Sequence, residues 1–296
     1  MDFSRLMLGT VQFGLNYGIA NTAGKPSYET VRQIIQTAVA NGVTSLDTAA
    51  SYGDSEVVLG QVLAELQLRD RVTIISKVPP ISGHNLTRPE AKKFIIESVE
   101  NSLRRLGVAK LAGCLFHVES DWPYLDLLQG VEQRGLIGGA GISLDSNQYC
   151  EPVLTSGAKF VQLPYNIFDR RYDAFLAAAP QHGIKVFTRS VYLQGLLLMP
   201  EDRIADHLRS VIPVRRQLAQ LAESAGITLS ELCMRYVLSH PSVTSVLTGV
   251  DNAEQLHQNL ELARRGPLDI ALCRQIRELV PFFEERIIRP FLWPKK

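Results

Sequence analysis

The sequence predicts an α/β fold, a single (β/α)8 (TIM) barrel with additional helices near its C-terminus. Short apolar segments of strand-like composition alternate eight times with longer segments whose apolar residues recur at helical spacing. No linker, repeat or low-complexity tract divides the 296 residues, so we expect one domain over residues 1–296. A closed barrel suits this pattern because each crossover helix covers the outside of a sheet without edges.

The first part of the chain contains three strand-then-helix units. Its strands are expected at residues 6–9, in the run that ends at Asp47, and at residues 72–77. Its helices are expected between Ser27 and Asn41, over residues 55–68, and between the capping-box pair Thr87/Glu90 and Gly107. The first helix is expected to bury an apolar face that includes Tyr28.

The rest of the chain continues the alternation with five more strands. These are expected in the run GCLFH that ends at His117 and at residues 136–143, 159–163, 184–188 and 244–248. Helices are expected near 122–133, after the fifth strand, and near 172–182, 213–224, 253–264 and 270–283, with a further one capped by Thr228 and Glu231. An irregular insertion occupies residues 190–206.

The main alternative is a doubly wound open sheet. Its dinucleotide-binding form needs GxGxxG after the first strand, where this chain reads GTVQFG. The nearest phosphate-loop pattern, Gly18 to Lys25, is one residue too long and is followed by Pro26 instead of Ser or Thr. We therefore treat both phosphate-binding motifs as absent.

Charge and composition favour a small-molecule partner. The formal net charge is +1, so the chain lacks the basic field typical of proteins that bind nucleic acid or anionic membranes. No signal-peptide-like or membrane-spanning apolar run occurs, and we expect a cytoplasmic protein, monomeric or a small homo-oligomer. The four cysteines and six histidines show no ligand spacing, so no metal site is expected.

Four polar residues at the ends of neighbouring strands form the candidate catalytic site: Asp47, Tyr52, Lys77 and His117. They suit proton transfer to a carbonyl oxygen, with Tyr52 as the acid. A cation about 4 Å from the phenolate, at an effective dielectric near 20, lowers the phenol pKa by roughly three units before desolvation is subtracted. Lys77 could supply that cation, Asp47 would keep it charged, and His117 would donate to the carbonyl.

The motifs around these residues resemble those of the aldo-keto reductases, in a bacterial-type, NADP-dependent form. DTAASYGDSE with Gly60, the lysine of ISKV and the histidine of LFH match the family's catalytic tetrad, and TSVLTGVDNAEQLHQNL resembles its C-terminal cofactor segment. The resemblance implies a TIM barrel that binds NADPH without a Rossmann motif and reduces aldehydes or ketones. Tyr52 would then be the proton donor.

The resemblance also implies a set of cofactor contacts. They are Gly9, Thr10, Asp47, Ser143, Gln162, Arg189, Ser190, Gly249, Gln255 and Asn259. Leu144 departs from the pattern, and Arg189 stands where the family places an aromatic ring against the nicotinamide. Many members bind the 2′-phosphate through cations at the positions of Gly249 and Gln255. We therefore expect NADPH as cofactor, with NADH as an alternative.

Simpler interpretations stay open for several of these residues. Asp47 and Lys77 taken alone could be a buried ion pair, and Arg189 could be a salt-bridging arginine. If Arg189 reaches the substrate, its forked head suits an anionic carbonyl compound, such as an oxo acid or a phosphorylated or nucleotide-linked sugar. A different class of function, a nicotinamide-binding regulatory subunit without turnover, would use the same scaffold.

Overall fold

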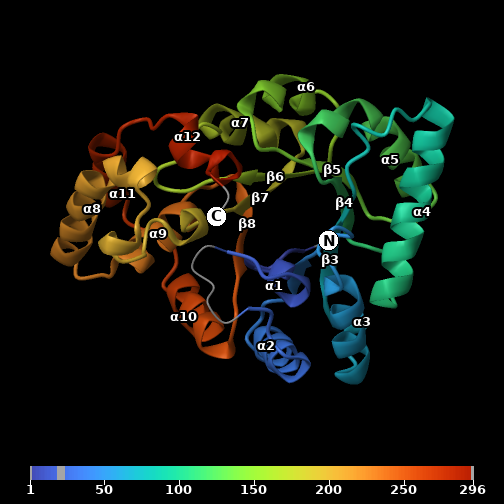
Figure 1. Cartoon of the computed structure of the whole chain (residues 1–296), viewed down its shortest axis with the longest axis horizontal. Helices are drawn as coiled ribbons and strands as arrows, with labels where there is room; N and C mark the ends of the chain where they lie inside the picture. Colours follow the sequence, from blue (N-terminus) through green and yellow to red (C-terminus); the bar gives the residue numbers. More distant parts are fainter. Residues whose placement is uncertain (1, 19–23, 295–296) are drawn as a thin grey trace.

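A closed barrel of eight parallel strands forms the centre of the protein (Figure 1). The structure, a computed structural model, describes residues 2–18 and 24–294. The strands pair in sequence order from β1 to β8, and β8 pairs back to β1. This confirms the (β/α)8 prediction. The segment Gly18 to Lys25, considered above as a phosphate loop, lies largely outside the described residues.

Each strand overlaps the run in which it was expected. The strands are β1 Leu6–Gly9, β2 Ser45–Asp47, β3 Thr73–Val78, β4 Gly113–Phe116, β5 Ala140–Ser143, β6 Phe160–Pro164, β7 Lys185–Arg189 and β8 Val243–Gly249. The expectation for β5 was too long, because the residues before Ala140 make only an isolated bridge, Leu111 with Ile137. His117 follows β4, yet its N–H still donates to the Val78 carbonyl and continues the ladder.

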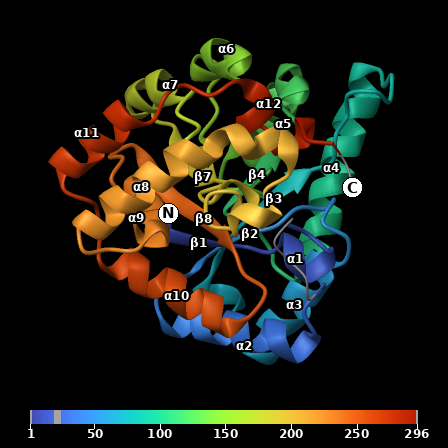
Figure 2. The same ribbon diagram turned by 60° about the vertical axis from the view of Figure 1, so that its left-hand side comes forward.

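Helices surround the barrel on all sides (Figure 2). They are α1 Val11–Gly14, α2 Tyr28–Ala40, α3 Ser55–Glu65, α4 Arg88–Leu106, α5 Leu125–Gln133, α6 Cys150–Leu154, α7 Asp173–Ala178, α8 Ile212–Ser224, α9 Leu229–Leu238, α10 Ala253–Arg264, α11 Ile270–Leu279 and α12 Glu285–Ile288. The capping box at Thr87 and Glu90, the left-handed Gly107 and the Thr228 cap are present as predicted. None of the helices in residues 2–18 and 24–294 is long and apolar enough to cross a membrane.

Three helical predictions were wrong in detail. Helix α3 ends at Glu65 instead of residue 68, because Gln67 has a left-handed φ of 54°. Helix α11 ends at Leu279, since Pro281 favours extended backbone at the preceding Val280. Tyr28 is exposed rather than buried, and its hydroxyl donates to Glu65 of α3. Helices α1 and α12, at four residues each, are too short to show a helical period.

The apolar core has two layers, one outside the barrel and one inside it. The alternation of inward and outward side chains along each strand positions the candidate site. A large cluster packs the outward faces of the strands against the helices. A smaller cluster, here called the inner core, fills the barrel interior and consists of Met7, Ile75, Ala112, Leu115, Phe160, Phe187 and Leu247. Phe3 packs edge-on against Phe160 and Phe187. Since side chains alternate along a strand, the residue two positions beyond an inner-core residue also faces inward.

Candidate active site

One inward position near the C-terminal end of each strand forms a ring above the inner core. This upper ring consists of Gly9, Asp47, Lys77, His117, Ser143, Gln162, Arg189 and Gly249. Six of the eight lie two residues beyond an inner-core residue of their own strand, as Lys77 does beyond Ile75. The strand periodicity therefore brings together residues that are far apart in the sequence, at the end of the barrel where active sites of this fold lie.

Lys77 and Asp47 form a buried ion pair in the ring, with Tyr52 against it. The lysine is 1% exposed and the aspartate 2%. Lys77 Nζ donates to both Asp47 carboxylate oxygens at 2.8 Å and to the Thr48 carbonyl at 2.9 Å. It also lies 3.3 Å from Tyr52 Oη. The Tyr52 oxygen thus accepts a hydrogen bond from an ammonium group.

The pKa values of Lys77 and Tyr52 are both raised in the folded protein. Burial alone would lower the pKa of Lys77, but Asp47 and Tyr52 raise it, and the net shift is upward, so Lys77 is an ammonium ion. Burial raises the pKa of Tyr52 by more than Lys77 lowers it. The lowering expected from Lys77 is thus present, but the loss of hydration outweighs it and the net shift is upward. Tyr52 carries its proton at neutral pH.

His117 faces Tyr52 across the ring. The two rings are perpendicular, at 85°, with centroids 5.5 Å apart. Burial lowers the pKa of His117 to about 3, with further lowering by Lys77 and Arg189, so the imidazole is neutral. Among the described residues its buried Nδ1 has no hydrogen-bond partner. We assign the proton to Nε2, because an unpaired lone pair is less costly than an unpaired N–H, and this leaves Nε2 as a donor.

Gln162 joins the ion pair from the far side of the barrel. Its Nε2 donates to Asp47 Oδ1 at 2.7 Å, and it is 1% exposed. Ser143, buried at the end of β5, is in register with Gln162. The structure thus brings both predicted residues into the ring, and it adds a contact to Asp47 that the sequence did not indicate.

Thr10 binds the backbone at the end of β2. Its N–H and hydroxyl both donate to the Asp47 carbonyl, at 2.9 and 3.0 Å. Its hydroxyl also pairs with Ser55 Oγ at 2.8 Å. Thr10 was predicted as a cofactor contact, yet its side chain is fully buried and holds the end of β2.

Two glycines that the sequence did not single out hold the Tyr52 turn. A Cβ added to Gly14 of α1 would lie 1.8 Å from the Tyr52 carbonyl oxygen, and one added to Gly53 would lie 2.5 Å from the Gly14 carbonyl. Gly53 also has a left-handed φ of 57°. Only residues without side chains permit this approach, which fixes the turn that presents Tyr52.

The upper ring has two glycines where β1 meets β8. Gly9 and Gly249 are in register there. A Cβ added to Gly9 would make ordinary contacts with backbone atoms, the nearest at 3.7 Å, whereas one added to Gly249 would lie 2.5 Å from the Gln12 amide. The amide of Gln12 lies over Gly249, and its buried Oε1 has no partner within the part of the chain that the structure describes. Without side chains at these two positions, a ligand would meet the backbone directly, and Gln12 Oε1 would be an acceptor for it.

Arg189 forms a salt bridge in this structure. Its Nη2 donates to Asp145 Oδ1 at 2.9 Å and to the Leu144 carbonyl at 3.1 Å. Ser190, the next residue, has a left-handed φ of 64°. The structure therefore gives Arg189 a partner, Asp145, that the sequence pattern did not reveal.

The remaining two predicted cofactor residues lie on α10. Gln255 Oε1 accepts from the Asp251 N–H at 2.8 Å, which ties it to the loop after β8. Asn259 is 8% exposed, and its Oδ1 lies 3.5 Å from the Tyr192 hydroxyl. Both side chains contact the chain itself, and neither carries a charge.

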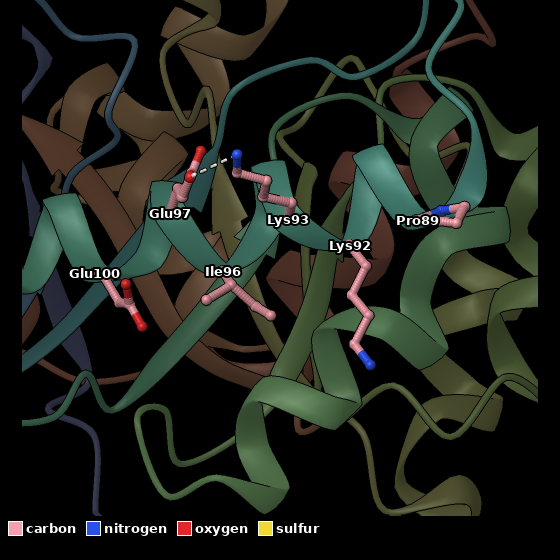
Figure 3. A pocket seen from close by; sticks show the side chains of 6 residues that line it. All are labelled: Pro89, Lys92, Lys93, Ile96, Glu97 and Glu100. Atoms are coloured by element: carbon pink, nitrogen blue, oxygen red, sulfur yellow. Dashed lines mark ion pairs between the residues drawn. The ribbon is translucent and has the colours of Figure 1, made fainter.

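Two shallow grooves on the helical outside contain none of the ring residues. One of about 360 Å³ follows α4, where Lys93 and Glu97 pair across a helical turn at 3.8 Å (Figure 3). The other, of about 440 Å³, lies between α3 and the end of α4. Within residues 2–18 and 24–294, no three His, Cys, Asp or Glu side chains are grouped as metal ligands would be.

Several known proteins are similar to this chain in sequence. The NADH-specific methylglyoxal reductase of Escherichia coli (strain K12) is 25% identical, over 80% of this chain and 84% of that protein. The L-glyceraldehyde 3-phosphate reductase of Escherichia coli O157:H7 is 25% identical, over 87% and 85%. A probable voltage-gated potassium channel subunit beta of Arabidopsis thaliana is also 25% identical, over 90% of each chain.

The structural and family comparisons agree. The holo form of aldo-keto reductase AKR11C1 from Bacillus halodurans superposes with a TM-score of 0.77 at 23% identity, over 96% of this chain and 95% of that one. The model of the Aldo/keto reductase family matches residues 5–281. Because this match covers nearly the whole chain, the protein belongs to the aldo/keto reductase family of oxidoreductases.

Proposed function

We propose that the protein reduces the carbonyl group of an aldehyde or ketone with NADPH or NADH. The observation that carries the proposal is the buried Lys77 ammonium, which contacts Asp47 at 2.8 Å and Tyr52 Oη at 3.3 Å. If Lys77 and Asp47 formed only a structural ion pair, the contact between Lys77 and the Tyr52 hydroxyl would have no role. A phenol beside a cation is a suitable acid for a developing alkoxide.

In this mechanism Tyr52 donates its proton to the substrate oxygen. Lys77 stabilises the phenolate that remains, and Asp47, held by Gln162, keeps Lys77 charged and in place. Neutral His117 donates from Nε2 to the same substrate oxygen and orients the carbonyl. When bound, the reduced nicotinamide supplies the hydride to the carbonyl carbon. Ser143, Gln162, Arg189 and the backbone at Gly9 and Gly249 would hold that cofactor.

We expect the proposed cofactor site to prefer NADPH only weakly over NADH. Gly249 and Gln255 offer no cation to a 2′-phosphate. Arg264 pairs with Glu261 at 2.7 Å, and Arg265 pairs with Glu231. These arginines at the far end of α10 therefore have other partners, and Asp251 in the loop after β8 adds a negative charge.

The substrate class depends on Arg189. An anionic carbonyl compound, such as an oxo acid or a phosphorylated or nucleotide-linked sugar, could share the guanidinium with Asp145. Arg189→Met should then raise KM for such substrates and leave KM for neutral aldehydes nearly unchanged. An equal loss for both classes would contradict an anionic substrate.

The second candidate is a nicotinamide-binding regulatory subunit without turnover. The similarity to a potassium channel subunit beta motivates it, over 90% of this chain. The test is the loss of NAD(P)H absorbance with a reactive aldehyde such as 4-nitrobenzaldehyde. We expect steady turnover; tight NAD(P)H binding without turnover of any aldehyde tried would favour the regulatory subunit.

A further inference from the structure

Asp145 connects the edge of the candidate site to the C-terminal segment. It directly follows Leu144, just beyond β5. One carboxylate oxygen accepts from Arg189 Nη2 at 2.9 Å, and the other accepts from Arg289 Nε at 3.1 Å. The Asp145 N–H is held in turn by Glu119 Oε2 at 2.6 Å. With both carboxylate oxygens paired and its backbone N–H held, Asp145 has little freedom to leave Arg189.

Arg189 lies where a charge affects the reaction centre. It occupies the upper ring, two residues beyond the inner-core Phe187, and it contributes to lowering the pKa of His117. In the proposed mechanism the carbonyl lies between Tyr52 and His117. The resemblance to the aldo-keto reductases implies that the hydride donor lies on the side formed by Ser143, Gln162 and Arg189.

An uncompensated arginine at this position would distinguish the two redox forms of the cofactor. The oxidised nicotinamide ring carries a positive charge, whereas the reduced ring is neutral. A guanidinium in a poorly hydrated site therefore repels the oxidised form alone. The Asp145 carboxylate, which pairs with Arg189, is placed to cancel that repulsion.

We infer that Asp145 is a positioning residue that holds the Arg189 guanidinium beside the nicotinamide site and cancels its charge, which lets the protein bind oxidised and reduced cofactor with comparable affinity. The inference rests on the proposed function, since it requires a nicotinamide next to Arg189. It adds a residue and a role that the catalytic tetrad does not contain. Arg289 ties the same carboxylate to the C-terminal segment and keeps it aimed.

The test measures dissociation constants of the oxidised and reduced cofactor by fluorescence titration and compares their ratio between variants. Asp145→Asn keeps the shape and removes the charge, so Arg189 is uncompensated. We expect its ratio, oxidised over reduced, to rise by about tenfold, equivalent to about 1.4 kcal/mol. Arg189→Met should lower the ratio, and the double variant should return it to near the wild-type value.

A matched control is Asp126→Asn, which also removes an aspartate from an arginine pair, that of Arg88, but on the outer helices. Its ratio should equal that of the wild type. Unchanged ratios in both Asp145→Asn and Arg189→Met, with both cofactors still bound, would overturn the inference while leaving the proposed function intact. If the wild type binds neither form, the proposed function itself fails.

Discussion

Removing Lys77 should damage stability and activity for separate reasons, and a second substitution can separate them. Lys77→Met leaves Asp47 buried, 2% exposed, without its cation. Breaking a buried ion pair by removing one partner costs about 3–5 kcal/mol. Gln162 Nε2 still donates to Asp47 at 2.7 Å, so we expect the lower part of that range. Turnover should also fall, because the Tyr52 phenolate loses its only contacting cation among the described residues.

The double variant Asp47→Asn/Lys77→Met removes both charges. Since no charge is then left unpaired, most of the lost stability should return, whereas turnover should stay low. Urea unfolding midpoints and NAD(P)H oxidation rates provide the two measurements. The reasoning would be refuted if Lys77→Met were as stable as the wild type, or if the double variant recovered turnover together with stability.

Two further predictions follow from the charges of the site. Burial lowers the pKa of His117 to about 3, against 6.5 for an unperturbed histidine. Between these pH values the unfolded chain binds a proton at this histidine that the folded protein does not, so the free energy of unfolding should decrease as the pH falls from 6.5 to 3. Unfolding measured at several pH values should show a smaller decrease in His117→Gln. The dissociation constants of NADPH and NADH should differ by less than the roughly ten- to hundredfold that one phosphate-binding arginine supplies, and a thousandfold difference would mean that another cation reaches the 2′-phosphate.

The strands and their inward positions were predictable because a barrel strand has a period of two. Lys77 and His117 end apolar runs and follow inner-core residues in phase, so their convergence follows from the fold alone. Capping residues such as Thr87 and Gly107 fixed helix ends for equally local reasons. These features depend on neighbours in the sequence, which a single chain displays.

Other features depend on contacts between distant residues. Gln162 reaches Asp47 across 115 residues, and Arg189 finds Asp145 across 44. The upward shift of the Tyr52 pKa depends on how much water the folded chain excludes, which composition does not state. Gly14 and Gly53 meet only once α1 packs on the Tyr52 turn. The partners of the candidate site residues were therefore not predictable from the sequence pattern.

The central claim is that Tyr52 gives the substrate its proton, and Tyr52→Phe tests it most directly. The variant removes one oxygen and keeps the ring, so the Lys77–Asp47 pair at 2.8 Å should remain. We predict cofactor binding like that of the wild type, measured by fluorescence titration. Turnover of an aldehyde should fall by about two to four orders of magnitude, the usual contribution of a general acid. Turnover near the wild-type rate would contradict the mechanism.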